Sequence, residues 1–149
     1  MQLLADAART AVPRWLVRCV LDTARRLQAS PSAELVSDAE EMSRVQSPLV
    51  LAELNALLAT DAEAQRTNPL SILRAATRHP NEVLARHHVP APQRTEFEER
   101  NFPTDIYALS PATWADVDES LEEPGLIWGA WKSKTVLDRR RASGGHPAG

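Results

Sequence analysis

The sequence has few of the residues that build disulfide-bonded, metal-bound or β-sheet proteins. It contains one cysteine, Cys19, which excludes an intrachain disulfide and a zinc site made of several cysteines. Five glycines, four tryptophans, two phenylalanines and one tyrosine are too few to suggest a β-sandwich or a small barrel. The glycine-rich patterns that hold phosphates or dinucleotides are also absent from the sequence.

Long hydrophobic runs and a strong net charge are missing as well. Polar residues break the segments Trp15–Leu21 and Leu49–Leu58 well short of the roughly 18 apolar residues that a membrane span requires. Asp6 and Arg9 interrupt the first apolar stretch, so we expect no signal peptide and no membrane association. The single cysteine predicts a reducing, cytoplasmic location. A net charge of −3 gives no overall reason to expect nucleic-acid binding.

What the sequence does contain is typical of a globular helical protein. Apolar residues make up 43% of the 149 residues and charged residues 25%, which is enough for one domain with a hydrophobic core. We expect a single helical domain over residues 1–141, or two subdomains joined near 61–67. The segment 142–149, with three glycines and a proline, predicts a disordered tail.

Eleven prolines are spread along the chain, and several follow a residue that caps helices well. Examples are Ser30-Pro31, Ser47-Pro48, Asn68-Pro69 and Ser110-Pro111. Serine or asparagine at the N-cap accepts a free backbone N–H, and proline fits the first helical position because it has no N–H to lose. Together with helical periodicity, these pairs predict helices over 2–11, 13–28, 31–45, 48–59, 69–78, 80–87, 93–100 and 124–140.

The predicted fold is therefore all-α: a compact bundle of about four longer helices with a proline-rich C-terminal wrap of short helices. The segment 48–59 is the most apolar, and we expect it to be central to the core. In the last helix, Leu126, Ile127, Ala130 and Trp131 fall on one side and are expected to face the core, whereas Trp128 points elsewhere.

Charge is segregated near the C-terminus, and this supports the leading functional interpretation. Residues 101–126 hold six acids and no base, whereas residues 127–149 hold five bases and one acid. An exposed Trp128 would anchor a partner, although it could equally cover a loop near 101–109. We therefore predict a non-catalytic adaptor or regulator, without a cofactor, that docks on another protein or forms a homodimer. Its partner-binding residues are Trp128, Trp131, Arg139 and Arg140.

The alternative interpretation is a phosphate or nucleic-acid binder. Arginines recur along one face of the segment 13–28, and the guanidinium group suits phosphate oxygens. No helix-turn-helix, zinc-finger or RNA-binding motif accompanies them. The candidate residues for this function are Arg14, Arg18, Arg25 and Arg26.

Other polar groups give weaker hypotheses. His79, Glu82 and His87, with His88 beside them, do not match a standard metal-ligand spacing, so we predict no metal site. Cys19 lies on an apolar helix face, where a free cysteine usually packs as a small hydrophobe. The acidic run over 116–123 lacks the ligand order of an EF-hand. A third interpretation, a small enzyme, requires a pocket near Tyr107, His87 and Asp105, and no catalytic residue is assigned.

Three stretches resemble a small all-helical family of high-GC actinobacteria. They are NPLSILRAATRHPNEVL from Asn68, FPTDIYALSPATWAD from Phe102, and EPGLIWGA from Glu123. The resemblance covers residues 68–132. It implies a helical fold, and because the family has no known activity it implies no site residues. Fifteen arginines against two lysines agree with a high-GC genome.

Overall fold

The computed structural model describes residues 2–27, 30–60, 68–90, 95–101 and 111–144. Within these ranges every regular element is a helix and no strand occurs, which confirms the predicted all-α fold. None of the described helices is both long enough and apolar enough to cross a bilayer. The elements are α1 (Gln2–Arg26), α2 (Ala33–Ala59), α3 (Pro69–Ala76), α4 (Arg78–Arg86), α5 (Glu96–Asn101), α6 (Trp114–Val117), the 3-10 turn η1 (Glu119–Leu121) and α7 (Glu122–Gly144).

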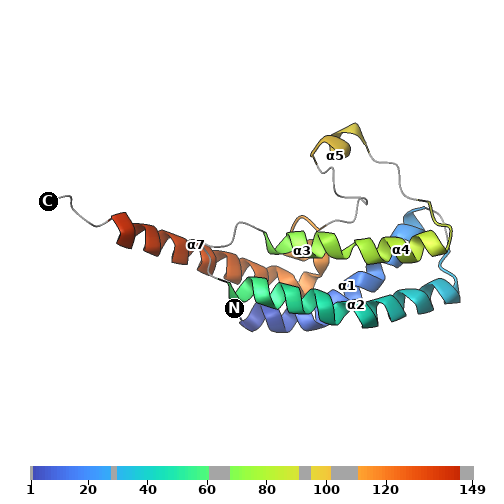
Figure 1. Cartoon of the computed structure of the whole chain (residues 1–149), viewed down its shortest axis with the longest axis horizontal. Helices are drawn as coiled ribbons and strands as arrows, with labels where there is room; N and C mark the ends of the chain where they lie inside the picture. The colour runs from blue at the N-terminus through green and yellow to red at the C-terminus, as the bar shows by residue number, and fades with distance from the viewer. Residues whose placement is uncertain (1, 28–29, 61–67, 91–94, 102–110, 145–149) are drawn as a thin grey trace.

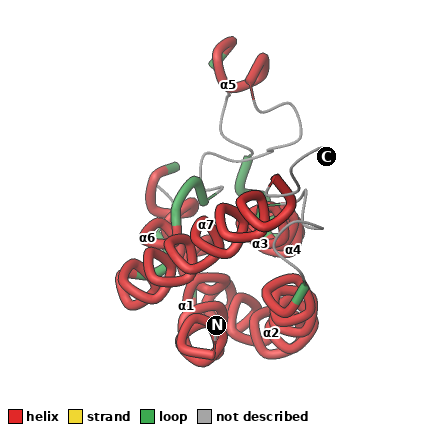
Figure 2. Tube along the Cα trace, turned by 90° about the vertical axis from the view of Figure 1, so that its left-hand side faces the viewer, coloured by secondary structure: helices red, strands yellow, loops and turns green. Residues whose placement is uncertain are grey.

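Two long antiparallel helices, α1 and α2, form the base of the molecule (Figure 1). The shorter α3 and α4 follow each other along the top of this pair, and α4 contacts both long helices. Viewed along the bundle, α7 lies above α1, and α6 lies on the side of α1 away from α2 (Figure 2). The predicted C-terminal wrap of short helices is present as α3 and α4, which pack on α2, and as α6 and η1, which pack on α1.

The core lies between α1, α2, α3 and α4 and is almost entirely aliphatic. Each helix contributes side chains at a spacing of three or four residues, so a single apolar face of each points inward. Val117 and Leu121 close the core from the C-terminal side. The largest fully buried side chains include Val12, Leu16, Val20, Leu54, Leu73, Val83, Leu84, Val117 and Leu121.

Two prolines that we expected to open helices lie inside them instead. Pro13 is in the middle of α1 and Pro48 is in the middle of α2. The predicted helices 2–11 and 13–28 therefore form the single helix α1, and the predicted helices 31–45 and 48–59 form α2. A proline inside a helix costs about 3 kcal/mol because it removes one backbone hydrogen bond and its ring crowds the previous turn. The apolar face of each long helix continues on both sides of its proline, and this burial outweighs the cost.

The buried Ser43 joins the two long helices beside one of these prolines. The Ser43 hydroxyl donates a hydrogen bond of 2.8 Å to the Pro13 carbonyl oxygen, which ties α2 to α1 at the proline. Ser47, expected to cap a helix, is itself buried and lies 3.4 Å from the Ser43 hydroxyl oxygen.

Other helix starts agree with the sequence to differing degrees. Asn68 caps α3 as predicted, accepting the Leu70 N–H at 3.1 Å with Pro69 in the first helical position. α2 is capped by Ser32 rather than Ser30, through the Leu35 N–H at 3.1 Å. The helix expected at Pro111 begins three residues later, where Thr113 caps α6.

α7 starts at Glu122, with Pro124 in its first turn, and continues to Gly144. Its end lies three residues inside the segment predicted as a tail. The residues 145–149 and the proposed subdomain junction at 61–67 lie outside the described residues.

Candidate interaction surface on α7

The first turns of α7 fasten this helix to the bundle through Trp128. Its side chain is only 8% exposed and meets the Trp114 ring edge-to-face, with the ring centroids 6.4 Å apart and the planes at 80°. The Lys132 ammonium lies 5.0 Å from the centroid of the Trp128 ring and covers its outer side. Trp128 is therefore not the exposed anchor that we expected, because it is buried against Trp114.

The opposite side of α7 is exposed and apolar, which reverses the predicted orientation of this helix. Leu126 is 69% exposed and Leu137 51%, and Ile127 and Trp131 are also exposed. These four are half of the large exposed apolar residues in the described part of the chain. We call Leu126, Ile127, Ala130, Trp131 and Leu137 the α7 surface.

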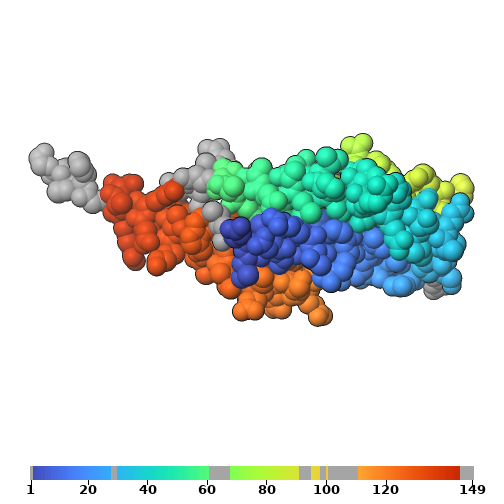
Figure 3. Space-filling view, turned by 90° about the horizontal axis from the view of Figure 1, so that it is seen from below, coloured from blue at the N-terminus to red at the C-terminus, as the bar shows by residue number. Residues whose placement is uncertain are grey.

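The second half of α7 extends beyond the ends of α1 and α2 (Figures 1 and 3). From Ala130 onward no α7 side chain is buried, whereas the first turns contain the buried Gly125 and Trp128. Trp131, Arg139 and Arg140, three of the four predicted partner-binding residues, are exposed on this extending half. The structure thus separates them from Trp128.

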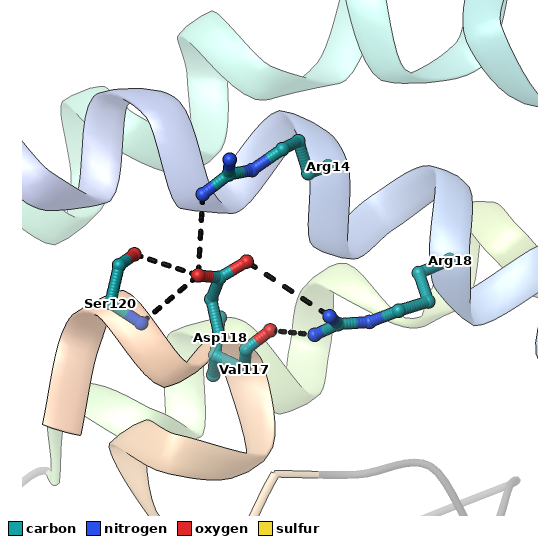
Figure 4. A network of polar contacts seen from close by, with 5 residues as sticks. All are labelled: Arg14, Arg18, Val117, Asp118 and Ser120. Atoms are coloured by element: carbon teal, nitrogen blue, oxygen red, sulfur yellow. Dashed lines mark hydrogen bonds and ion pairs between the residues drawn. The ribbon is translucent and has the colours of Figure 1, made fainter.

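The arginines of the alternative interpretation face carboxylates. Asp118 Oδ1 accepts a hydrogen bond from Arg14 Nη2 at 3.2 Å, and Asp118 Oδ2 lies 4.0 Å from Arg18 Nη1 (Figure 4). Arg18 also donates to the Val117 carbonyl oxygen. Asp118 accepts from the Ser120 backbone N–H at 3.1 Å and its hydroxyl at 2.7 Å, so it caps η1 as well.

These contacts lower the pKa of two carboxyl groups. Partial burial raises the pKa of Asp118, but the two Ser120 hydrogen bonds and the charges of Arg14 and Arg18 outweigh it, so the pKa is lowered overall. The pKa of Asp116 is lowered mainly by hydrogen bonds from the Thr113 backbone and side chain in the capping box of α6. Asp116 and Asp118, two acids of the predicted acidic run, therefore stabilise the local fold.

A groove of about 520 Å³ lies between α1 and α2, next to this network. Pro13, Val17 and Leu21 supply apolar lining, and four arginines (Arg14, Arg18, Arg25 and Arg44) lie around it. Arg25 pairs with Asp22 at 3.0 Å, and Arg44 pairs with Glu41 at 2.6 Å. Arg26 is exposed and does not line the groove. The lining arginines are thus near carboxylates that compete with a bound phosphate.

The histidines do not converge on one site. His87 Nε2 lies 2.9 Å from Asp38 Oδ2 and links α4 to α2, whereas His79 Nδ1 lies 3.6 Å from Glu82 Oε2 on α4 itself. His88 is exposed and has a positive φ of 56°. Among the described residues, no three histidine, cysteine, aspartate or glutamate side chains are grouped as metal ligands would be.

Cys19 is buried on the core face of α1, and burial raises the pKa of its thiol to about 12. A thiol with such a pKa carries almost no thiolate near neutral pH, so its role here is packing. Tyr107 and Asp105, which the enzyme hypothesis requires, lie outside the described residues.

Sequence reasoning missed two residues that hold the C-terminal helices in place: Trp114, which packs against α7, and Asp118, which joins η1 to α1. Trp114 lies in a short helix with no apolar periodicity of its own, and its role appears only when α7 folds back against it. Asp118 is one of several acids in its segment, but the spacing Asp118-x-Ser120 is that of a helix cap and is a usable signal.

Comparison with known proteins adds no relative: no family matches this chain, and neither a curated protein nor a solved structure is significantly similar to it. The resemblance to an actinobacterial family therefore stays a prediction.

Proposed function

We propose that this chain is a non-catalytic cytoplasmic interaction protein that docks through the α7 surface. The observation that carries the proposal is the concentration of exposed apolar side chains on one helix that extends from a packed bundle. Contiguous apolar patches on protein surfaces usually mark interaction sites.

The composition of the α7 surface supports docking on protein. Trp131 supplies a large, rigid ring, and tryptophan contributes disproportionately to binding energy at interfaces. Lys134, Arg140 and Arg141 are exposed on the same half of the helix. Such charges orient a partner and speed its association more than they strengthen the complex.

The base of α7 favours the same function. Trp128 and Trp114 hold the first turns of the helix against α1 and α6, so the extending half is presented from a fixed position. A preorganised helix loses less conformational entropy on binding than a segment that must fold first.

Photo-crosslinking from single positions tests this proposal. A photoreactive phenylalanine derivative replaces Trp131 or Leu137 on α7, and in the control it replaces Leu49, which is 59% exposed on α2. We expect crosslinks in cells of the source organism from both α7 positions and few from position 49. Equal crosslinking from all three positions, or none from α7, would contradict the proposal.

The groove between α1 and α2 supports a second candidate, the binding of phosphate groups or nucleic acid. Four arginines line this groove, although three carboxylates (Asp22, Glu41 and Asp118) already pair with them. Binding of this kind falls steeply as salt rises. This function requires retardation of single-stranded DNA or RNA at low salt that is lost in the variant R14A/R18A, and it is excluded if no retardation occurs.

A further inference from the structure

One exposed stripe of α7 has a symmetrical sequence pattern. It begins with the acids Glu122 and Glu123 and ends with the bases Arg140 and Arg141. Between them, at a spacing of three or four residues, lie Leu126, Ala130, Ser133 and Leu137. This spacing places all eight residues on one side of the helix. All eight are exposed, and the stripe faces away from Gly125 and Trp128, which pack on the bundle.

The pattern reads the same from either end, except that the sign of the charge is reversed. Its midpoint lies between Trp131 and Lys132. Leu126 and Leu137 are equally far from that midpoint, as are Ala130 and Ser133. Glu122 mirrors Arg141 in the same way, and Glu123 mirrors Arg140.

We propose that α7 is the interface of a homodimer in which two copies of this helix lie antiparallel across a two-fold axis at that midpoint. This inference rests on the proposed function, since it identifies the partner of the α7 surface as a second copy of the chain. A two-fold interface requires a self-complementary surface. The stripe on α7 is self-complementary. Leu126 of each copy meets Leu137 of the other, and the acids of each copy meet the arginines of the other.

The small residues at the centre set the distance between the helices. Ala130 and Ser133 lie where the two backbones come closest, and short side chains there let the leucines on either side make contact. Ile127 and Trp131 are also exposed, on the part of the helix surface between the stripe and Trp128. The helix is about 34 Å long, at about 1.5 Å per residue, so the two ends of the interface are well separated.

Charge selects this arrangement over the others. In a parallel pair the acids of the two copies would lie together, and so would the arginines. In the antiparallel pair, each end of the interface places the acids of one copy beside the arginines of the other. In the described part of the chain, none of the four terminal residues (Glu122, Glu123, Arg140 and Arg141) forms an ion pair within the monomer. Exposed ion pairs add little energy, so they fix the register while the apolar contacts supply the affinity.

The mass of the full-length protein in solution is the first test. Sedimentation equilibrium over a concentration series is expected to give twice the mass of the 16.4 kDa chain. The variant L126D/L137D is expected to raise the dissociation constant at least about tenfold, because it places carboxylates at the centre of an apolar contact. Leu49→Asp on α2 is the matched control and leaves the dimer intact. Helical content by circular dichroism confirms that each variant folds.

Charge exchange tests whether the ends meet as proposed. The variant E122R/E123R carries only bases at both ends of the stripe, and R140E/R141E carries only acids. Each is expected to dimerise more weakly alone than the wild type, because like charges meet at both ends, and an equimolar mixture of the two is expected to recover the wild-type affinity.

Cysteine pairing tests the register directly, in a Cys19→Ala background. The single variants Leu126→Cys and Leu137→Cys should not form disulfide dimers alone, because in the antiparallel register each cysteine lies far from its own copy in the other chain. Mixing the two variants under oxidation should give a disulfide heterodimer.

The proposal is overturned if the wild-type chain is monomeric across the series, if both charge variants dimerise alone as the wild type does, or if the cysteine mixture forms no heterodimer. A monomeric chain that still crosslinks from position 131 to another protein would overturn the homodimer and leave the proposed function standing. Absence of both self-association and crosslinking would overturn both.

Discussion

Gly125 lies so close to the Trp114 indole that no side chain fits between them. A Cβ atom on residue 125 would be 2.4 Å from Trp114 Cδ1, 2.5 Å from Cγ and 2.9 Å from Cβ. Because the crowded atoms are near the backbone of Trp114, the ring cannot simply swing aside. Gly125 thus lets Trp114 enter the space beside α7, where it packs against Trp128.

Gly125→Ala is therefore expected to weaken the attachment of α7. Overpacking a well-filled site costs typically about 1–3 kcal/mol, and we expect that loss in the free energy of unfolding measured with urea. Tryptophan fluorescence should change in the folded state as well, since the Trp114–Trp128 contact is disturbed.

Gly129→Ala is the matched control, one turn later in the same helix. Nothing lies within 4 Å of a Cβ there, so replacing glycine should stabilise the helix by about 0.5–1 kcal/mol. If both substitutions changed stability in the same direction, the packing at Gly125 would not be the reason that glycine stands there.

Asp118 joins the C-terminal segment to α1, and its substitution should reveal how much that junction contributes. Asp118→Asn removes the charge that faces Arg14 and Arg18 and weakens the cap on η1. A loss of about 1–2 kcal/mol is expected at neutral pH, because hydrogen bonds to a charged group are the stronger ones. Asp6→Asn, which removes an exposed pair with Arg9, should change stability by less than about 0.5 kcal/mol.

The effect of Asp118→Asn should also depend on pH in a defined direction. The pKa of Asp118 is lower in the folded protein than its ordinary value of 3.8. The carboxylate therefore contributes its full stability above that ordinary value and loses it as the pH falls through the folded-state pKa. Urea unfolding of both proteins from pH 7 to pH 2 should show the difference shrinking in acid. A difference that stays constant over this range would contradict the charge contacts of Asp118.

The prolines show what could be predicted from the sequence and what could not. At Asn68-Pro69 the local signal agrees with the fold, because the cap and the first helical turn need no distant partner. At Pro13 and Pro48 the same local signal is wrong. There the outcome depends on whether the residues before and after the proline bury a continuous face against another helix, and sequence spacing alone does not establish this.

The orientation of α7 could not be predicted from the sequence, for a related reason. Periodicity correctly identifies Leu126, Ile127, Ala130 and Trp131 as one side of a helix, but not which side faces the bundle. Gly125 and Trp128 determine which side of α7 faces the bundle, because the Trp114 ring packs against both of them. The side of α7 with the apolar pattern typical of a core face is exposed here, and Trp128, the predicted anchor, is buried in the core.

Pro48→Ala tests the argument about interior prolines. Pro48 is exposed in the middle of α2, so the substitution loses little packing and allows a backbone hydrogen bond from residue 48 to the Arg44 carbonyl. Removing the proline recovers its cost of about 3 kcal/mol. The greater freedom of the unfolded chain offsets about 0.4–1 kcal/mol of this recovery, so the expected stabilisation is about 1–3 kcal/mol. Pro69→Ala should instead destabilise the protein, because Pro69 is fully buried and already stands at the first helical position. Thermal unfolding of both variants measures the contrast, and a lower melting temperature for Pro48→Ala would mean that the proline shapes α2 in a way that its neighbours require.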